Sequence, residues 1–282
     1  MKKNTLFAAV LAVVMAAFTF SCKQQEGNVN PVKTSAISTE VIAQFKSLGI
    51  DARDAKFGEV TNELTGEKQT GYTLEKDLFV SEKQLAEMLS SSVKTGPDGE
   101  QYRTTNLVNG TRTIRVIGYT GGSFALTSKM RSGLQQAVAS YNALPLRLSF
   151  SLSFATSTNA DIVVYKVSGG AGGSAGFPSG GNPYKWVRIN SGTDAYSTAV
   201  NRHVIAHEIG HCIGFRHTDW FNRSISCGSG GNEGTAGVGA IHIPGTPTTN
   251  VTRNTSIMVS CFNSGSNGVF TSSDVTALNF LY

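Results

Sequence analysis

The sequence is short of charged residues for its length. Asp, Glu, Lys and Arg make up 15% of its 282 residues, whereas hydrophobic residues make up 40%. Disordered chains have the opposite balance, because they bury too little apolar surface to offset the entropy lost on folding. The composition therefore excludes a disordered protein and predicts a folded one, with one large domain or two modest ones.

Basic residues are nowhere clustered with aromatic residues. The 24 Lys and Arg residues are scattered along the chain, whereas a nucleic-acid-binding domain collects them in a patch or along one helix. We therefore expect no nucleic-acid partner.

The two parts of the chain differ in the sign of their charge. Residues 23–105 hold 10 basic and 13 acidic residues, a net charge of −3, and residues 106–282 hold 12 and 6, a net charge of +6. Two such parts attract one another, as a pro-segment and the domain that it covers would. A drift in composition explains the numbers equally well.

No apolar run is long enough for a transmembrane helix, which needs about 20 residues. The longest run, residues 6–18, follows Lys2 and Lys3 and is typical of a signal peptide. It ends in Thr19-Phe20-Ser21-Cys22, which resembles the lipobox of a bacterial lipoprotein. We expect residues 1–21 to be a signal peptide of that type, Cys22 to be lipidated, and residues 22–37 to be a polar tether.

Either form of this signal takes the protein out of the cytosol. A lipid on Cys22 predicts attachment to the outer membrane or cell surface, whereas an ordinary signal peptide predicts a secreted protein. An oxidising compartment favours one disulfide among the three remaining cysteines. We expect it between Cys227 and Cys261, which lie in Gly- and Ser-rich loops, and expect Cys212 to be a buried residue of a helix.

Residues 38–105 are expected to form a pro-segment or an accessory region. Apolar residues at helical spacing predict a helix that ends at Gly49, and GYTLEKDLFV predicts a strand through Val80, followed by a short helix. The turn signal Gly96-Pro97-Asp98-Gly99 marks the boundary with the rest of the chain.

Residues 106–282 have the pattern of an α+β domain with a twisted mixed sheet. Strands are expected at 111–119, 146–155, 160–167 and 185–191, and two main helices at 127–143 and 196–213. A loop-rich C-terminal part over 224–270 ends in the helix SSDVTALNFLY. The glycine-rich loop before 185–191 is either simple slack or lies beside an open edge strand at 185–191. In the second case, which the motif below favours, an extended peptide can add along Trp186, Val187 and Arg188.

The stretch HEIGHCIGFRH, residues 207–217, has the spacing of a metal site. His207 and His211 are one helical turn apart, so their imidazoles project from the same face. Two converging nitrogens suit Zn²⁺, and Glu208, rotated by about 100° around the helix, flanks the metal as a proton acceptor. Gly214 allows the chain to turn back, so that His217 reaches the same ion.

Other residues near this motif have a weaker claim on a metal. Glu233 is the one downstream glutamate that could replace His217 as third ligand, but it lies in a loop. We expect His203 to be solvated or hydrogen-bonded, His242 to be structural, and Asp219 to brace the turn at His217.

The extended pattern H-E-x-x-H-x-x-G-x-x-H resembles that of the metzincin metallopeptidases. HEIGH followed by CIGFRHTDW, with AGFPSGGNP, IHIPGTP and SSDVTALNFLY further on, resembles the bacterial dual-action HEIGH metallopeptidase family over roughly residues 100–282. The resemblance implies one catalytic zinc ion on His207, His211 and His217, with Glu208 as general base and acid. It also implies a Met-turn at Met258, beneath the metal.

Two positions depart from the astacin branch of the metzincins. Thr218 stands where astacins carry glutamate, and Ser260 where they carry tyrosine. The astacin link to a buried new N-terminus is therefore not expected. Zymogens of this kind block the metal with a cysteine or a carboxylate, and Asp77, Glu59 and Asp98 are the candidates here.

We therefore expect an exported zinc-dependent endopeptidase that acts on a protein or peptide substrate. The alternative is a surface adhesion or binding lipoprotein on an inactive metzincin scaffold. Neither the substrate preference nor the oligomeric state can be read from the sequence.

Overall fold

The computed structural model describes residues 35–48, 50, 52, 55–74, 77–90, 101–104, 106–229, 241–247 and 251–282. The expected signal peptide, Cys22, the turn at 96–99 and nearly all of the tether lie outside these residues. Within them, every helix is too short or too polar to cross a membrane.

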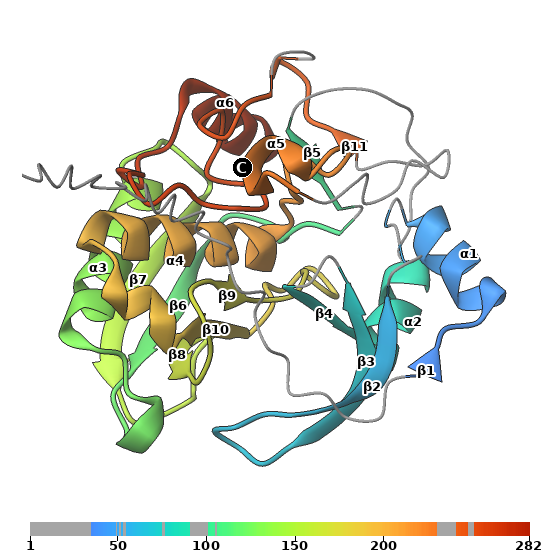
Figure 1. The fold of residues 1–282 in the computed structure, drawn as a ribbon, viewed down its shortest axis with the longest axis horizontal. Helices are drawn as coiled ribbons and strands as arrows, with labels where there is room; N and C mark the ends of the chain where they lie inside the picture. The colour runs from blue at the N-terminus through green and yellow to red at the C-terminus, as the bar shows by residue number, and fades with distance from the viewer. Residues whose placement is uncertain are drawn as a thin grey trace, which may run out of the picture.

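The N-terminal region, here residues 35–90, folds around a core of its own. Its antiparallel sheet has the order β1-β2-β3-β4 and packs with two helices (Figure 1). The elements are β1 (Ser35–Ala36), α1 (Thr39–Ser47), β2 (Lys56–Thr61), β3 (Lys68–Leu74), β4 (Leu78–Ser81) and α2 (Glu82–Ser90). The buried cluster includes Phe45, Leu74, Leu78, Met88 and, from the larger part of the molecule, Phe177.

One strand expected in this region is in fact two. Leu74 pairs with Leu78, so the chain reverses between β3 and β4. The apolar residues of GYTLEKDLFV therefore belong to both arms of a hairpin. A single strand through Val80 was therefore the wrong expectation.

The larger part is built on a five-stranded mixed sheet of order β7-β6-β8-β10-β9. All neighbours are parallel except β9, which is antiparallel to β10. The strands are β6 (Arg112–Tyr119), β7 (Leu148–Ala155), β8 (Ile162–Val167), β9 (Gly173–Ser174) and β10 (Trp186–Asn190). The α+β class and the mixed sheet are confirmed.

The expected open edge at 185–191 is not an edge. Arg188 and Ile189 pair with Ser174 and Gly173, so β9 closes that side of β10. A strand of two residues inside a glycine-rich loop carries no periodic signal, which is why the sequence did not predict it.

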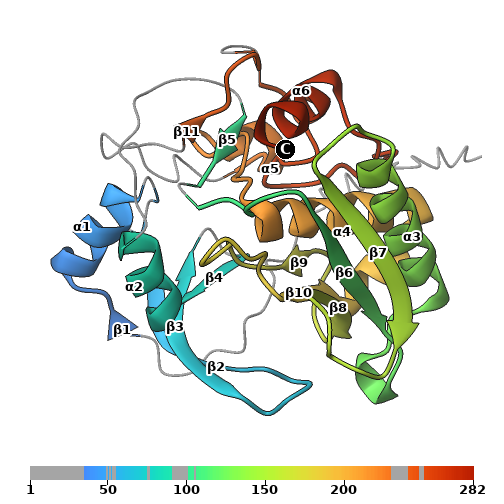
Figure 2. The ribbon, with the colours of Figure 1, turned by 180° about the vertical axis from the view of Figure 1, so that it is seen from behind.

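Two long helices, α3 (Ser128–Asn142) and α4 (Thr198–Ile213), pack on one face of this sheet (Figures 1 and 2). The hydroxyls of Thr127 and Ser197 cap them by accepting from the backbone N–H groups of Met130 and Val200. Both helices begin within a residue or two of the expected positions.

The remainder is loop-rich, as expected. It holds the short 3₁₀ turns Gly122–Phe124 and Ser191–Ala195, α5 (Ser224–Cys227), the pair β5 (Tyr102–Arg103) and β11 (Ile241–His242), and the final helix α6 (Ser272–Leu281). Cys227 and Cys261 form a disulfide, the pairing expected from the sequence, and Cys212 is a buried free thiol. The division at residue 105 remains a proposal, since residues 102–103 pair with the C-terminal part.

Candidate metal centre

Helix α4 ends where the third histidine needs the chain to turn back. Gly214 has a φ of 116°, in the left-handed region that favours glycine. A Cβ at this position would lie 2.8 Å from Leu107 Cδ2 and 3.0 Å from the Asn106 carbonyl. Both the conformation and the space therefore require glycine, as the motif predicted.

The structure brings the three predicted histidines together. The Nε2 atoms of His207 and His211 are 2.9 Å apart, and the ring of His217 lies 5.2 and 4.9 Å from theirs, centroid to centroid. All three are buried. Together with Asp77 they present four donor atoms, all within 4.8 Å of one another.

Hydrogen bonds behind the site orient two of the rings. His207 Nδ1 donates to the Ile257 carbonyl at 2.7 Å, and His211 Nδ1 donates to the Phe215 carbonyl at 2.8 Å. These bonds fix the tautomer, so that each Nε2 lone pair faces the centre. Burial, then the neighbouring histidine charges, lower the pKa of His207 to about 4 and that of His211 well below its usual range. The imidazoles of His207 and His211 are therefore neutral, the form that binds metals.

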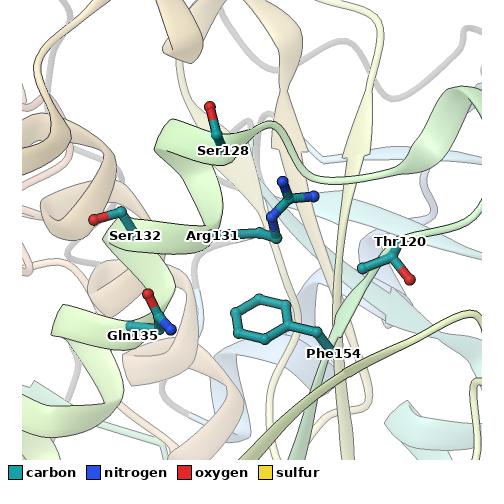
Figure 3. Close-up of a pocket in the computed structure, with 6 residues that line it drawn as sticks. All are labelled: Thr120, Ser128, Arg131, Ser132, Gln135 and Phe154. Atoms are coloured by element: carbon teal, nitrogen blue, oxygen red, sulfur yellow. The ribbon is translucent and has the colours of Figure 1, made fainter.

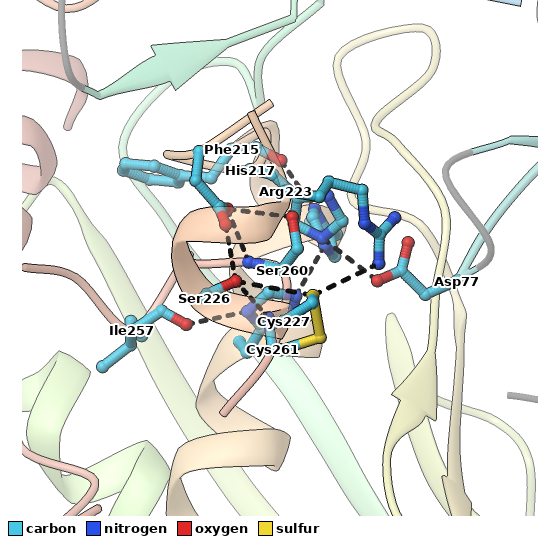
Figure 4. A network of polar contacts seen from close by, with 12 residues as sticks. Asp77, Phe215, His217, Arg223, Ser226, Cys227, Ile257, Ser260 and Cys261 are labelled. Carbon is cyan, nitrogen blue, oxygen red and sulfur yellow. Dashed lines mark hydrogen bonds and ion pairs between the residues drawn. A yellow bond between two sulfur atoms is a disulfide. The ribbon is translucent and has the colours of Figure 1, made fainter. Parts of the chain in front are cut away.

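Asp77 completes the cluster from the N-terminal region. Its Oδ2 lies 3.0 Å from His217 Nε2 (Figure 4). Burial alone would raise the pKa of this carboxyl, but the charge and hydrogen bond of His217 lower it well below its usual range. Of the other two carboxylates that the sequence offered for blocking the metal, Glu59 pairs with Lys68 at 2.9 Å, and Asp98 lies outside the described residues.

Glu208 stands beside the cluster, between α4 and β9. It is 2% exposed, and its Oε1 lies 2.7 Å from where a Cβ on Gly173 would be. Burial, and then the charge of Asp77, raise the pKa of Glu208 well above its usual range. The absent side chain at Gly173 is what makes room for this carboxylate.

The expected Met-turn lies against the same helix. Met258 Sδ is 2.6 Å from where a Cβ on Gly210 would be, and its carbonyl accepts from the Thr218 N–H at 2.8 Å. Asp219 is fully buried and accepts from the N–H and hydroxyl of Ser260 at 2.7 and 2.9 Å. Asp219 therefore ties the chain just after His217 to the end of the Met-turn, and its bracing of the turn at His217 stays a prediction.

The sequence did not point to Asp274, which supports the Met-turn from α6. Its carboxylate accepts from the Ser256 hydroxyl at 2.5 Å and from the Ile257 N–H at 3.1 Å, while also capping α6 at Thr271. The capping signal T-x-x-D is visible in the sequence. The second role is not, because it joins residues that are far apart in the chain.

The other histidines lie outside the metal cluster. His203 is buried, and its Nδ1 is 2.8 Å from the Ser266 hydroxyl, so it is hydrogen-bonded as expected. His242 Nε2 is 2.9 Å from the Thr246 hydroxyl. Glu233, the alternative third ligand, is not among the described residues.

The donor set fits Zn²⁺. Three imidazole nitrogens and one carboxylate oxygen are ligands that zinc takes in a four-coordinate site. One of the four, Asp77, comes from a separate segment, so the larger part alone offers three protein ligands and leaves the fourth position open. That arrangement is typical of a catalytic site rather than a structural one.

A hollow of about 350 Å³ lies away from the metal cluster. It is lined by α3 and the sheet residue Phe154, with Arg131 beside the ring (Figure 3). No residue of the metal cluster lines it.

Comparison with known proteins agrees with the site. The family model described as "Dual-action HEIGH metallo-peptidase" matches residues 72–282. Two solved structures of myroilysin are similar at 17% identity, with TM-scores of 0.39 and 0.37, covering 63% and 61% of this chain and 96% and 83% of theirs. No curated protein matches the chain. Since the family model covers three-quarters of the sequence and includes the whole histidine motif, the chain belongs to the dual-action HEIGH metallopeptidase family.

Proposed function

We propose that the protein is a zinc-dependent endopeptidase of metzincin type. One observation carries the proposal. Three buried histidines present their nitrogens to one point, and Glu208 lies beside them on the same helix. Family membership supports the peptidase activity. The endopeptidase specificity, the zinc ion and the role of Glu208 are our proposal.

His207, His211 and His217 would hold the zinc. When bound, zinc supplies electrophilic chemistry: it lowers the pKa of a water ligand and polarises the scissile carbonyl. Glu208 takes a proton from the attacking water, and the new C–O bond forms at the carbonyl carbon. The C–N bond then breaks, and Glu208 delivers the proton to the leaving amine.

The substrate backbone is proposed to add to the edge of the sheet at β9. Gly173 and Ser174 form that edge, and Gly173 lies directly against Glu208. A peptide strand paired there passes the general base. We therefore assign the binding of the substrate backbone to residues 173–175, in place of Trp186, Val187 and Arg188.

The same edge is occupied by the N-terminal region, which supports a latent form. Phe79 N–H donates to the Ala175 carbonyl at 3.0 Å, and Ala175 N–H donates to the Asp77 carbonyl at 3.0 Å. Leu78 bridges Ala175 in parallel orientation. We infer that this segment blocks the edge and that Asp77 takes the open ligand position, so that the full-length chain is a zymogen.

The test compares Asp77→Ala with Asp77→Ala/Glu208→Gln. The first variant removes the blocking carboxylate and so weakens the hold of the N-terminal segment on the β9 edge, which substrate can then displace. It is expected to cleave a casein or peptide-library substrate. The second keeps the shape of residue 208 but removes its basicity, and activity should fall by about 10²–10⁴-fold. Zinc content, measured by mass spectrometry, serves as the control and should be equal.

Equal cleavage by both variants would remove Glu208 from the mechanism. Zinc binding with no cleavage by either would favour a binding or adhesion lipoprotein instead. Export, with a lipid on Cys22, stays a proposal, which mass analysis of the membrane-bound protein can test.

A further inference from the structure

Arg188 is an almost buried cation that binds a carboxylate away from the metal. It is 6% exposed, and its Nε donates to Glu63 Oε2 at 3.1 Å. The Tyr165 hydroxyl donates to the same oxygen at 2.8 Å. The guanidinium also lies 5.8 Å from the centre of the Tyr165 ring. One carboxylate oxygen is thus held by two donors from neighbouring strands.

The carboxylate comes from the N-terminal region. Glu63 lies between β2 and β3, and this hairpin reaches beneath β8 and β10 in both views (Figures 1 and 2). Among the residues that the structure describes, Glu63 is the one acidic side chain paired with Arg188. Removal of the N-terminal region would therefore leave the Arg188 cation without its counter-ion, which is unfavourable.

The site lies one strand from the edge proposed to bind the peptide. Arg188 pairs with Ser174 of β9, and Ile189 pairs with Gly173. Gly173 lies against Glu208 of α4, so Arg188 and Ser174 face the opposite side of the sheet. Every second side chain of a peptide added at β9 points to this side, towards the guanidinium.

The net charge of the larger part of the molecule favours an acidic ligand. Residues 106–282 hold 12 basic and 6 acidic residues, a net charge of +6. A positive surface raises the rate at which acidic partners arrive, and a fixed arginine then selects a carboxylate geometrically.

We propose that Arg188 and Tyr165 form a carboxylate-binding site that selects acidic side chains in the protein substrate. In the full-length chain Glu63 occupies this site as an internal ligand. Once the N-terminal region has moved, an Asp or Glu side chain of the substrate takes its place. The substrate half of this inference rests on the proposed peptidase function, whereas the carboxylate site does not.

The first experiment vacates the site in the full-length protein. Glu63→Ala should lower the melting temperature by several degrees, and added acetate should restore most of that loss. Acetamide, with the ionic strength held constant by sodium chloride, should not. The matched control is Glu59→Ala, which removes a partly buried acid of the same hairpin that pairs with Lys68, and here acetate should have no specific effect. No difference between acetate and acetamide in Glu63→Ala would overturn the carboxylate site.

The second experiment measures selectivity. In the Asp77→Ala/Glu63→Ala background, kcat/KM is measured on peptides that differ by Glu or Gln at one position after another. At one position Glu should be preferred by about 10-fold or more, as expected for a hydrogen bond to a charged group. Arg188→Gln should abolish that preference. Arg188→Lys, which keeps the charge if the first variant fails to fold, should reduce it.

The outcomes separate the two proposals. Absence of all cleavage contradicts the peptidase function and leaves the acetate result standing. Cleavage without any Glu preference, alongside acetate rescue, would overturn the substrate half and leave Arg188 as an anchor for Glu63 alone.

Discussion

At the scale of single residues, two glycines position the chemistry by having no side chain. Gly173 leaves space for Glu208, and Gly214 turns the chain towards the third ligand. The sequence predicted the second from its place in the motif. It did not predict the first, because Gly173 stands among seven glycines in residues 169–181, and only the fold shows which of them touches the carboxylate.

His203 should make the protein sensitive to acid. Burial, and then the charge of His207, lower its pKa from 6.5 to about 3. The unfolded chain therefore binds a proton below 6.5, while the folded chain does so only near pH 3, and stability falls as the pH drops through this window. His203→Gln should weaken that fall by about 2 kcal/mol between about pH 7 and about pH 4.5.

Urea unfolding of both proteins at the two pH values measures this difference. The other buried histidines are present in both, so their contribution cancels. An equal loss of stability in the two proteins would show that His203 is not held neutral by the fold.

At the scale of elements, local patterns predicted the helices and the long strands well. The caps of α3 and α4 and the alternation in β6 are encoded within a few neighbouring residues. The order of the strands in the sheet is not encoded locally, because it depends on which distant segments pair. For this reason the sequence did not predict β9 as the edge of the sheet. It also did not select Asp77 over Glu59 as the carboxylate that blocks the metal, because that choice depends on β4 lying beside Ala175.

Helix α6 should tune the metal site through the Met-turn. Asp274 holds the Ile257 N–H, and the Ile257 carbonyl holds His207. Asp274→Asn replaces an acceptor by a donor and loosens this chain of contacts. We expect zinc affinity to fall by about 10–100-fold, measured by competition with a chromogenic chelator.

Asp161→Asn is the matched control. Asp161 is a partly buried carboxylate that pairs with Arg112 and Arg115 on the sheet, so its loss should leave zinc affinity unchanged. Equal affinities in both variants would contradict a supporting role for α6.

At the scale of the whole molecule, the disulfide fastens the loop-rich part to the Met-turn. Cys227 is the last residue of α5, and Cys261 stands three residues after Met258, with a separation of 34 residues. Closing a loop of that length is expected to stabilise the fold by about 3–4 kcal/mol. Cys227→Ser/Cys261→Ser should lose this stability in denaturant unfolding.

Reductant supplies the internal control for this prediction. It should destabilise the wild type to the level of the double variant and leave the variant itself unaffected. A wild type that is indifferent to reductant would show that the bond does not form in the native protein.

The two parts of the molecule also share one aromatic side chain. Phe177 follows β9 in the larger part, yet it is buried in the N-terminal core at 1% exposure, and its ring lies 5.9 Å from that of His211. Departure of the N-terminal region would expose the apolar Phe177 ring beside the histidines of the metal cluster. The released N-terminal fragment would keep the apolar pocket that binds Phe177, together with Asp77 and Glu63. If the zymogen is activated by cleavage, as proposed above, the released fragment would therefore act as a competitive inhibitor of the active enzyme. Full activity would then depend on dilution or further digestion of that fragment.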